Sequence, residues 1–438
     1  MENHPLKVTL LGCGVVGSQV ARGLLNDTAH LSARIGAPVV LTAIVVRDPA
    51  EITDPLIPKS ILTTDAKAAV TEADVVIELF GGLEPARSLI LLALQNGASV
   101  VTANKALLAA HGPELYAAAE KAGVDLLYEA SVGGAIPIVR PIRQSLAGDH
   151  VNRILGIVNG TTNFVLDRMA TDGSAFDDAV KVAQERGFAE ADPTADVDGH
   201  DAAAKAAILA SMAFHTRVGI DSVATEGIRN ITADDVAWAK QTGQVIKLLA
   251  IAERTPSGIS VRVHPALIPE EHPLAAVRGA FNAVFVEAQL AGPLMFYGQG
   301  AGGVATSSAV LGDFVSVARH RVLGGRALGE SAYADLPVLK PGAAVTRYQI
   351  RMVVDDQPGV LSQVAGVLAA HHISIEKVNQ TPITDDEGTL ENAGATLVIT
   401  THSASEQAFA EVKAELEASP HVLEIVSVLR VEIGNSNG

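Results

Sequence analysis

The chain has 438 residues, of which 48% are hydrophobic and 18% charged, and its 32 basic and 49 acidic side chains give a formal net charge of −17. The high apolar content excludes an intrinsically disordered chain, and at roughly 100–200 residues per domain the length predicts two to four domains. The acidic balance argues against nucleic acids and anionic membrane surfaces as partners, because both attract basic faces.

The sequence shows no export or membrane signal. Its N-terminus lacks a basic segment followed by an apolar core and a cleavage site, and no stretch reaches the roughly 18–20 uninterrupted apolar residues of a membrane helix. The single cysteine, Cys13, rules out an internal disulfide and a cysteine-rich metal site. We therefore expect a cytoplasmic protein that does not bind membranes.

The first 135 residues alternate between strand and helix patterns. Short apolar runs typical of buried parallel strands occupy residues 8–11, 41–46, 75–79, 99–102 and 126–129. Helical segments rich in alanine and leucine lie between them, at residues 16–25, 84–95 and 113–122. This alternation predicts an α/β domain with a doubly wound parallel sheet, which we place at residues 1–135.

Residues 136–323 show a mixed pattern that predicts an α+β domain with a substantial sheet. Helices are expected at residues 162–170, 177–185, 201–214 and 233–242. Strand-like runs occur at residues 154–158, 259–263 and 283–289. A last helix, at residues 307–319, is expected to return toward the first domain.

A linker and a third unit complete the chain. Glycine, proline and alanine mark the linker at residues 324–346. The third unit, residues 347–433, has 13 acidic but only 5 basic side chains from Arg347 onward, an asymmetry that indicates a separate unit. Its expected elements are a strand at 348–354, a helix at 359–371, strands at 373–378 and 395–400, a helix at 405–418 and a strand at 422–431. This βαββαβ order predicts a ferredoxin-like fold of the small-molecule-sensing type.

Three glycines follow the first expected strand. Gly12, Gly14 and Gly17 form G-x-G-x-x-G at the start of a helix, with Val15 and Val16 inside the pattern. The first glycine permits a tight turn, the second lets a pyrophosphate approach the backbone, and the third allows close packing of helix on strand. The position of the pattern predicts a dinucleotide site at the helix N-terminus, with a tight turn that binds nothing as the alternative.

The residues after the second strand bear on the type of dinucleotide. This strand ends in Val46-Arg47-Asp48. Arg47 can pair with a 2′-phosphate, which favours NADP, whereas Asp48 can accept ribose hydroxyls and leaves NAD as the alternative. Arg47 could equally be an ordinary surface arginine.

One lysine lies on an apolar helix face. Lys205 shares this face with Ile208, Leu209 and Met212, and Asp201 lies one turn earlier. Because an unpaired buried ammonium is costly, we expect Asp201 to pair with it. The pattern predicts a lysine held in a cleft as a general acid, and a snorkelling lysine in a simple helix salt bridge is the alternative.

Several carboxylates precede Lys205 in the sequence. They are Glu190, Asp192, Asp196, Asp198 and Asp201. Such a loop suggests calcium, but its spacing lacks an EF-hand pattern. Glu190 is instead expected to bind an ammonium or hydroxyl group of a polar substrate.

Two further segments are expected near the same cleft. Lys105 follows a strand, so it lies at the sheet edge where open α/β sheets bind ligands and can meet a cofactor phosphate or a substrate carboxylate. Residues 297–303 (YGQGAGG) predict a flexible turn and a helix N-terminus near the cofactor. The alternatives are a surface charge on a helix for Lys105 and a plain interdomain loop for the glycine-rich stretch.

Together, these segments resemble homoserine dehydrogenases of the monofunctional kind with a C-terminal ACT domain. The resemblance covers essentially the whole chain, through GCGVVGS, VTANKALL, EASVGGAIPI, NGTTNF, GFAEADPTADVDGHDAAAKAAILA, YGQGAGG and DDQPGVLSQVAGVL. It implies an N-terminal Rossmann domain, a central catalytic and dimerisation domain and an ACT domain. The implied activity is the reversible NAD(P)H-dependent reduction of L-aspartate 4-semialdehyde to L-homoserine, in threonine, methionine and isoleucine biosynthesis.

The resemblance also implies roles for the polar residues. Lys205 would donate a proton to the aldehyde oxygen, Asp201 would orient Lys205 and contact the substrate, and Glu190 would bind the substrate's amino end. Lys105 matches a lysine beside cofactor and substrate. These roles agree with the chemistry, because hydride delivery to a carbonyl leaves negative charge on oxygen, which a nearby ammonium can stabilise and protonate.

Backbone positions are implied in the same way. Gly187 and Gly303 correspond to positions that line the nicotinamide cleft. A monovalent cation, usually sodium, is bound mainly by carbonyl oxygens at the positions of Glu129, Val132, Gly134 and Ile136. Many relatives have tyrosine where Phe188 stands and proline where Ala305 stands, and losing the phenol is expected to alter a hydrogen bond near the substrate.

The third unit has a ligand loop of its own. Asp356, Gly359 and Val360 lie in DQPGVL, between its first strand and helix, and this loop resembles those with which ACT domains bind amino acids. Threonine, the end product of the implied pathway, is the expected inhibitor, and a purely structural dimerisation domain is the alternative. We expect a homodimer or homotetramer.

Two other functions remain open from the sequence. One is another NAD(P)-dependent amino-acid or semialdehyde dehydrogenase. The other is a catalytically silent amino-acid sensor, which the presence of Lys205, Asp201 and Glu190 disfavours.

Overall fold

The computed structural model describes residues 4–384 and 390–432. The N-terminal part is a six-stranded, wholly parallel sheet in the order β3-β2-β1-β4-β5-β6. This is the strand order of a dinucleotide-binding doubly wound fold, with its switch point between β1 and β4. The strands are β1 (Leu6–Leu11), β2 (Val39–Val45), β3 (Leu62–Thr63), β4 (Val75–Glu78), β5 (Ser99–Thr102) and β6 (Leu126–Leu127).

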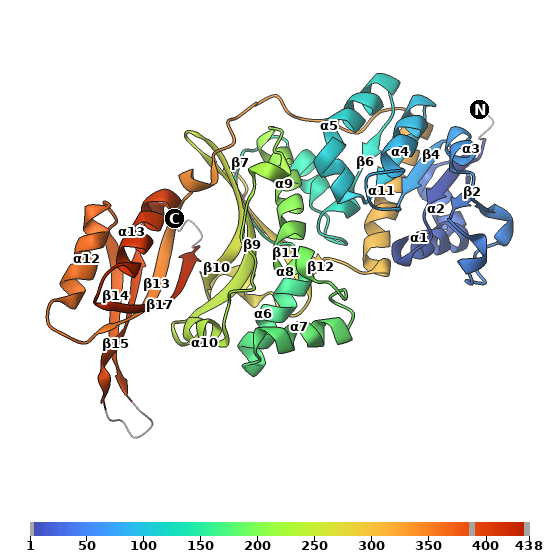
Figure 1. Cartoon of the computed structure of the whole chain (residues 1–438). Helices are drawn as coiled ribbons and strands as arrows, with labels where there is room; N and C mark the ends of the chain where they lie inside the picture. Colours follow the sequence, from blue (N-terminus) through green and yellow to red (C-terminus); the bar gives the residue numbers. More distant parts are fainter. Residues whose placement is uncertain (1–3, 385–389, 433–438) are drawn as a thin grey trace.

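Helices cover this sheet. They are α1 (Val15–Asn26), α2 (Thr28–Ile35), α3 (Ala66–Thr71), α4 (Ala86–Gln95), α5 (Lys105–Ala122) and, from much later in the chain, α11 (Gly303–Leu323). Phe314 and Val317 of α11 are buried in the same apolar cluster as Val20 of α1 and Val8 of β1. A late helix therefore does return to the first domain, as its sequence position predicts (Figure 1).

The central part is an antiparallel sheet. Its strands are β7 (Val151–Ile157), β9 (Gln244–Thr255), β10 (Gly258–Pro269), β11 (Phe281–Ala288) and β12 (Gly292–Gln299). The short β8 (Ala224–Thr225) is an exception and pairs in parallel with β10. Its helices are α6 (Gly160–Asp172), α7 (Phe176–Glu185), α8 (Thr194–Val197), α9 (His200–Phe214) and α10 (Ala233–Gln241). Helix α9 lies between this sheet and α5 of the first domain (Figure 1).

The C-terminal part has the predicted βαββαβ order. Its elements are β13 (Val345–Asp355), α12 (Val360–Ala370), β14 (Ile375–Thr384), β15 (Leu390–Thr401), the short β16 (Ala404–Ser405), α13 (Glu406–Glu417) and β17 (Val422–Val431). The strand order β17-β13-β15-β14 is that of a ferredoxin-like sheet. Residue 433, the predicted end of this unit, lies outside the described residues.

The central and C-terminal sheets are continuous. Strand β17 pairs in parallel with β10 at Ala266↔Arg430 and Leu267↔Val431, which produces one 11-stranded sheet. Directly after this pairing, the Glu432 backbone N–H donates to the Leu267 carbonyl at 2.9 Å.

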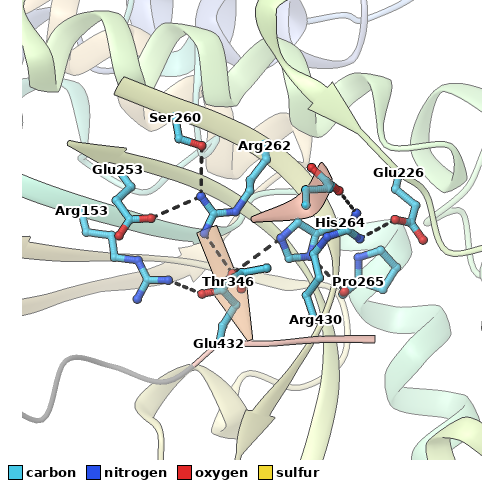
Figure 2. Close-up of polar contacts among 11 residues, drawn as sticks. Arg153, Glu226, Glu253, Ser260, Arg262, His264, Pro265, Thr346, Arg430 and Glu432 are labelled. Atoms are coloured by element: carbon cyan, nitrogen blue, oxygen red, sulfur yellow. Dashed lines mark hydrogen bonds and ion pairs between the residues drawn. The ribbon is translucent and has the colours of Figure 1, made fainter. Parts of the chain in front are cut away.

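A buried ionic cluster fixes this junction. The carboxylate of Glu432 accepts from Arg153 and, at 3.1 Å, from Arg262 Nη2, so that it lies between two guanidinium groups (Figure 2). Arg262 also reaches Glu253 at 3.3 Å. Burial would raise the pKa of Glu432, but the charges of Arg262 and Arg153 lower it to about 2. We call Arg153, Arg262 and Glu432 the seam cluster.

The predicted linker lies against the central domain. Residues after α11 run over the upper side of the molecule in Figure 1 and reach β13. Arg217 forms a bidentate pair with Glu330 at 2.7 and 2.8 Å, and Val338 bridges to Ile259 of β10. Within the part of the chain that the structure describes, no helix is long and apolar enough to cross a membrane.

Candidate active site

The glycine pattern forms a tight turn between β1 and α1. Gly12 has φ +100°, and a Cβ there would lie 3.0 Å from the Leu79 carbonyl oxygen, so that only glycine fits without strain. A Cβ at Gly17 would lie 2.2 Å from the Gly12 carbonyl oxygen. In contrast, the space at Gly14, the N-cap of α1, is open. The loop thus has the shape that lets a pyrophosphate approach the N-terminus of α1.

A second helix begins beside this loop. A Cβ at Gly303, the first residue of α11, would lie 2.5 Å from the Val15 carbonyl oxygen, so the two helix N-termini meet. The side chains of Val15 and Val304 are 77% and 73% exposed there, and Val16 packs on the first-domain core. Sequence reasoning expected a helix only from residue 307 and a flexible turn at residues 297–303. Instead, β12 extends to Gln299 and α11 begins at Gly303.

Arg47 stands at the carboxyl end of β2. Its side chain is exposed and has no hydrogen-bond or ion-pair partner among the described residues. The neighbouring Asp48 is engaged, because its carboxylate accepts from the Ala50 backbone N–H at 2.8 Å and caps a short 3-10 turn. The free guanidinium can pair with a 2′-phosphate, while the Asp48 carboxylate, which accepts one backbone N–H through Oδ1, keeps acceptor capacity for ribose hydroxyls.

Two lysines from different domains meet at one carboxylate. Lys105 begins α5 behind the Asn104 N-cap, whose side chain accepts from the Leu107 N–H at 3.1 Å. The Lys105 ammonium donates to Asp201 Oδ1. Lys205, one turn after Asp201 on α9, donates to Asp201 Oδ2 at 2.8 Å. We call Lys105, Asp201 and Lys205 the lysine cluster.

Burial and charge together set the state of Asp201. Its side chain is 8% exposed, and burial would raise its pKa, but the charges of Lys205 and Lys105 hold it well below the ordinary value. The Lys205 side chain is 10% exposed, whereas that of Lys105 is 43% exposed. The cluster therefore holds an ionised carboxylate and is open to solvent on the Lys105 side.

The end of β7 contributes two groups to the cluster. Lys205 Nζ donates to the Val158 carbonyl at 2.7 Å. Asn159 donates to Asp201 Oδ2 at 3.0 Å and to Asp196 at 2.7 Å, while its own side-chain oxygen caps α6 through the Thr162 N–H at 2.9 Å. Sequence reasoning missed Asn159 as a site residue. An asparagine directly before a helix signals an N-cap, but nothing local shows that its amide reaches α9.

The Glu190 side chain, in the acidic loop before α8, lies apart from the lysine cluster. Glu190 is exposed, only its backbone carbonyl is engaged, and no side-chain contact joins it to the lysine cluster in the described residues. Gly187 is exposed with φ +73°. The ring of Phe188 is 43% exposed and packs against Phe164 with centroids 5.0 Å apart. Ala305 lies in the first turn of α11.

The loop after β6 is buried beside α11. The Glu129 carboxylate accepts from the N–H groups of Ile138 and Val139 at 2.7 Å each, and burial raises its pKa. Val132, Gly134 and Ile136 are buried, and among the described residues none of their carbonyl oxygens accepts a hydrogen bond. Carbonyl oxygens without hydrogen bonds in buried residues fit a hard monovalent cation, whereas the Glu129 carbonyl already accepts from the Val132 N–H at 3.5 Å.

The C-terminal ligand loop connects β13 with α12. Gly359 has φ +97° and is the N-cap of α12, and Val360 is buried in the core of this domain. The carboxylate of Asp356 accepts from Gln380 of β14 at 3.1 Å. The loop thus presents a helix N-terminus at the edge of the C-terminal sheet.

Comparisons with known proteins agree over the whole chain. Residues 137–315 match the homoserine dehydrogenase family, residues 12–129 match the homoserine dehydrogenase NAD binding domain, and residues 348–421 match the ACT domain. The chain is 52% identical to homoserine dehydrogenase of Mycobacterium tuberculosis over 438 residues, which cover 98% of each chain. It is 50% identical to that of Corynebacterium glutamicum over 432 residues, which cover 97% of this chain and 95% of the relative.

The chain belongs to the homoserine dehydrogenase family. It is an NAD(P)-dependent oxidoreductase that acts on CH–OH groups and carries an ACT domain. A homoserine dehydrogenase structure from Thiobacillus denitrificans superposes with a TM-score of 0.90 at 39% identity, covering 98% of this chain and 99% of that one. A hyperthermophilic archaeal homoserine dehydrogenase in complex with NADPH superposes with a TM-score of 0.61 at 26% identity. The match covers 72% of this chain and 98% of that one. The predicted family, enzyme class and fold class are confirmed.

Proposed function

We propose that the enzyme reversibly reduces L-aspartate 4-semialdehyde to L-homoserine with NADPH, and that Lys205 protonates the developing alkoxide. The observation that carries this proposal is the lysine cluster, which holds a buried ammonium at the meeting point of the nucleotide-binding and central domains. A bound nicotinamide supplies the hydride. Everything else that the reaction needs is a donor for the oxygen and partners for a substrate that carries both an ammonium and a carboxylate.

Lys205 is well placed for proton donation. Two of its three N–H donors are fixed, one by the Val158 carbonyl and one by Asp201, so the third is directed by the other two. A preorganised donor stabilises the charge that develops on oxygen without reorganising during the reaction. In this proposal, Asp201 orients Lys205 and also contacts the substrate. Lys105 binds a cofactor phosphate or the substrate carboxylate, and Glu190 binds the substrate's amino group.

The cofactor site is assigned to the two meeting helix N-termini. Gly12, Gly14, Val15, Val16 and Gly17 would hold the pyrophosphate, and Gly187 and Gly303 would line the nicotinamide cleft. The free Arg47 guanidinium supports NADP as the preferred form, with NAD as the alternative. A relative with NADPH bound is consistent with this preference.

A monovalent cation, with sodium as the candidate, is assigned to Glu129, Val132, Gly134 and Ile136. The support is that Val132, Gly134 and Ile136 are buried and that, in the described residues, their carbonyl oxygens accept no hydrogen bond. The cation would hold the loop after β6 against the start of α11. We assign it no step in the chemistry.

Regulation is assigned to the ACT domain. We propose that threonine binds at Asp356, Gly359 and Val360 and inhibits the enzyme, which would serve threonine, methionine and isoleucine biosynthesis in the cytoplasm. The assembly would be a homodimer or homotetramer. The domain limits 1–135, 136–323 and 347–433, with a linker at 324–346, belong to the same proposal.

One assay tests substrate and regulation together. NADPH oxidation is followed at saturating cofactor with aspartate semialdehyde, with a shorter and a longer semialdehyde as matched alternatives, and threonine is then titrated. The proposal expects turnover with aspartate semialdehyde that exceeds turnover with either alternative, and inhibition that disappears in Gly359→Val. Equal turnover of all three aldehydes would overturn the substrate assignment, and insensitivity to threonine would overturn the regulatory one.

A further inference from the structure

A pocket apart from the lysine cluster lies under the linker. Its volume is about 450 Å³, and its walls come from α5, α9 and residues 215–219, with residues 328–333 as the cover. This size is within the roughly 300–1,000 Å³ of small-molecule sites. None of the glycine-loop residues, and no member of the lysine cluster, lines it.

The cover is held by specific contacts. Arg143 Nη2 donates to the carbonyls of Leu328 and Gly329. On the other side, Ser331 Oγ lies 2.8 Å from His215 Nδ1, and the ring of Tyr333 stacks on His215 with centroids 4.6 Å apart. The cover is therefore fixed to both sides of the pocket and forms a defined wall.

The walls are mostly apolar and carry one partly unpaired cation. Leu108, Ile208 and Met212 supply the apolar surface, together with the tyrosine rings at 116 and 128. Arg143 lies over the Tyr128 ring at 5.6 Å, and among the described residues only its Nη2 donates hydrogen bonds, which leaves the other guanidinium donors for a ligand. The charge of Arg217 is balanced by Glu330, so the pocket has one excess positive charge.

We propose that this pocket binds a small monocarboxylate with a branched or aromatic hydrocarbon body. A carboxylate can accept two parallel hydrogen bonds from a guanidinium, and the tyrosine and aliphatic walls suit a hydrocarbon group of up to one ring. The cover belongs to the linker that leads to the ACT domain, so that a ligand held here also fixes the path of that linker.

Binding here would reach the active site through two helices. Leu108 is one turn after Lys105 on α5, and Ile208 is one turn after Lys205 on α9. A ligand packed against both helices at these positions fixes their spacing, and we expect this to restrict the adjustment of Lys105 against Asp201. We therefore expect inhibition that neither NADPH nor the aldehyde relieves. This second part rests on the proposed roles of the lysines, whereas binding itself does not.

Calorimetry on the full chain tests binding without reference to activity. The probe is 3-phenylpropionate, for which we expect one site per chain with a dissociation constant on the order of 0.1–1 mM. The neutral 3-phenylpropionamide is expected to bind at least about tenfold more weakly, because it lacks the charge that pairs with Arg143. Absence of binding by the acid, or equal binding of acid and amide, would overturn the proposal.

Paired variants locate the site. Ala109→Phe fills the pocket from α5 and should abolish binding, whereas Ala117→Phe makes the same exchange on an exposed position of α5 outside the pocket and should not. If Ala109→Phe fails to fold, Ala332→Leu fills the pocket from the cover. Unchanged affinity in a folded filling variant would show that the probe binds elsewhere. Binding without inhibition would overturn only the coupling through Lys105 and Lys205.

Discussion

The lysine cluster and the seam cluster are built alike but do different things. In each, one buried carboxylate lies between two cationic side chains that come from different parts of the fold: Asp201 between Lys105 and Lys205, and Glu432 between two arginines. In each, the neighbouring positive charges keep the pKa of the carboxyl low. The two clusters differ in the type of cation and in their access to water.

The difference in cation matters for proton transfer. A lysine can release its proton when its surroundings favour the neutral form, whereas an arginine stays charged in any protein environment. The lysine cluster is also open, with Lys105 43% exposed, whereas the arginine side chains of the seam cluster are 7% and 4% exposed. Under the proposed function, lysines thus occur where a proton must move, and arginines where two domains are joined.

The seam cluster should show the larger effect on stability. Glu432→Gln removes the one negative charge between Arg153 and Arg262, and breaking such a buried pair costs about 3–5 kcal/mol. We expect the free energy of unfolding to fall by this amount, with kcat nearly unchanged while the chain stays folded. Denaturant unfolding checks this, and Glu424→Gln, an exposed exchange on the same strand, is the control. A loss of less than about 1 kcal/mol would mean that the seam pairs contribute little.

The lysine cluster should show the larger effect on catalysis. In Asp201→Asn, the ammonium of Lys205 loses its charged anchor, and we expect kcat to fall by about 10²-fold, close to 2.7 kcal/mol in activation free energy. The matched exchange Asp198→Asn, in a carboxylate that pairs with exposed Arg229, should leave kcat unchanged. Steady-state kinetics with NADPH measure kcat for both variants. Equal kcat in the two variants would remove the distinction between the clusters.

Acid should lower the stability of the fold through His264 of β10, which lies 3.7 Å from Glu432 of the seam cluster. Burial and the charge of Arg430 lower the pKa of His264 to about 3 in the folded chain. In the unfolded chain this histidine takes up a proton near pH 6.5, so protonation favours unfolding between these two pH values. Stability should therefore fall as the pH drops from about 6.5 toward 3, by up to roughly 1.4 kcal/mol per pH unit, and Glu432 adds to the loss below its ordinary pKa of 4.5. In His264→Gln, the loss of unfolding free energy above about pH 4.5 should be smaller than in the unmodified enzyme, as measured by denaturant unfolding at each pH. Identical profiles of unfolding free energy against pH for the two proteins would contradict this.

The smallest effect concerns the cofactor. Arg47→Ala should raise the KM for NADPH about tenfold and leave the KM for NADH unchanged, because only NADPH has a 2′-phosphate to pair with the guanidinium. Arg34→Ala, an exposed exchange on α2, is the control. If both dinucleotides lose affinity equally, Arg47 acts on the shared part of the cofactor.

The sequence predicts the two clusters unequally. Lys205 and Asp201 are four residues apart on one helix, so their pairing follows from helical spacing, and the structure confirms it. Glu432 lies 279 residues from Arg153, and no local pattern could connect them. Strand β9 was missed for a related reason: residues 245–252 form an apolar run interrupted only by Lys247, which by periodicity fits a buried helix as well as a strand.

Other parts of the fold depended on tertiary contacts. Helix α5 begins at Lys105, eight residues before the predicted start at residue 113, with Pro113 inside it. The alternation of strand and helix in the first domain and the βαββαβ order of the third were predicted correctly, because each has its own regular spacing and apolar core. Composition predicts a linker at residues 324–346, but it gives no indication that Gly329 and Glu330 contact Arg143 and Arg217.

The most direct test of the account is the rate of hydride transfer in Lys205→Met. A single-turnover measurement with preloaded NADPH and aspartate semialdehyde isolates this step, and Lys181→Met, an exposed exchange on α7, is the control. The account predicts a rate reduced by about 10²–10⁴-fold, the usual contribution of a general acid, with the affinity for NADPH unchanged. A Lys205→Met enzyme that transfers hydride at the rate of the control would contradict it.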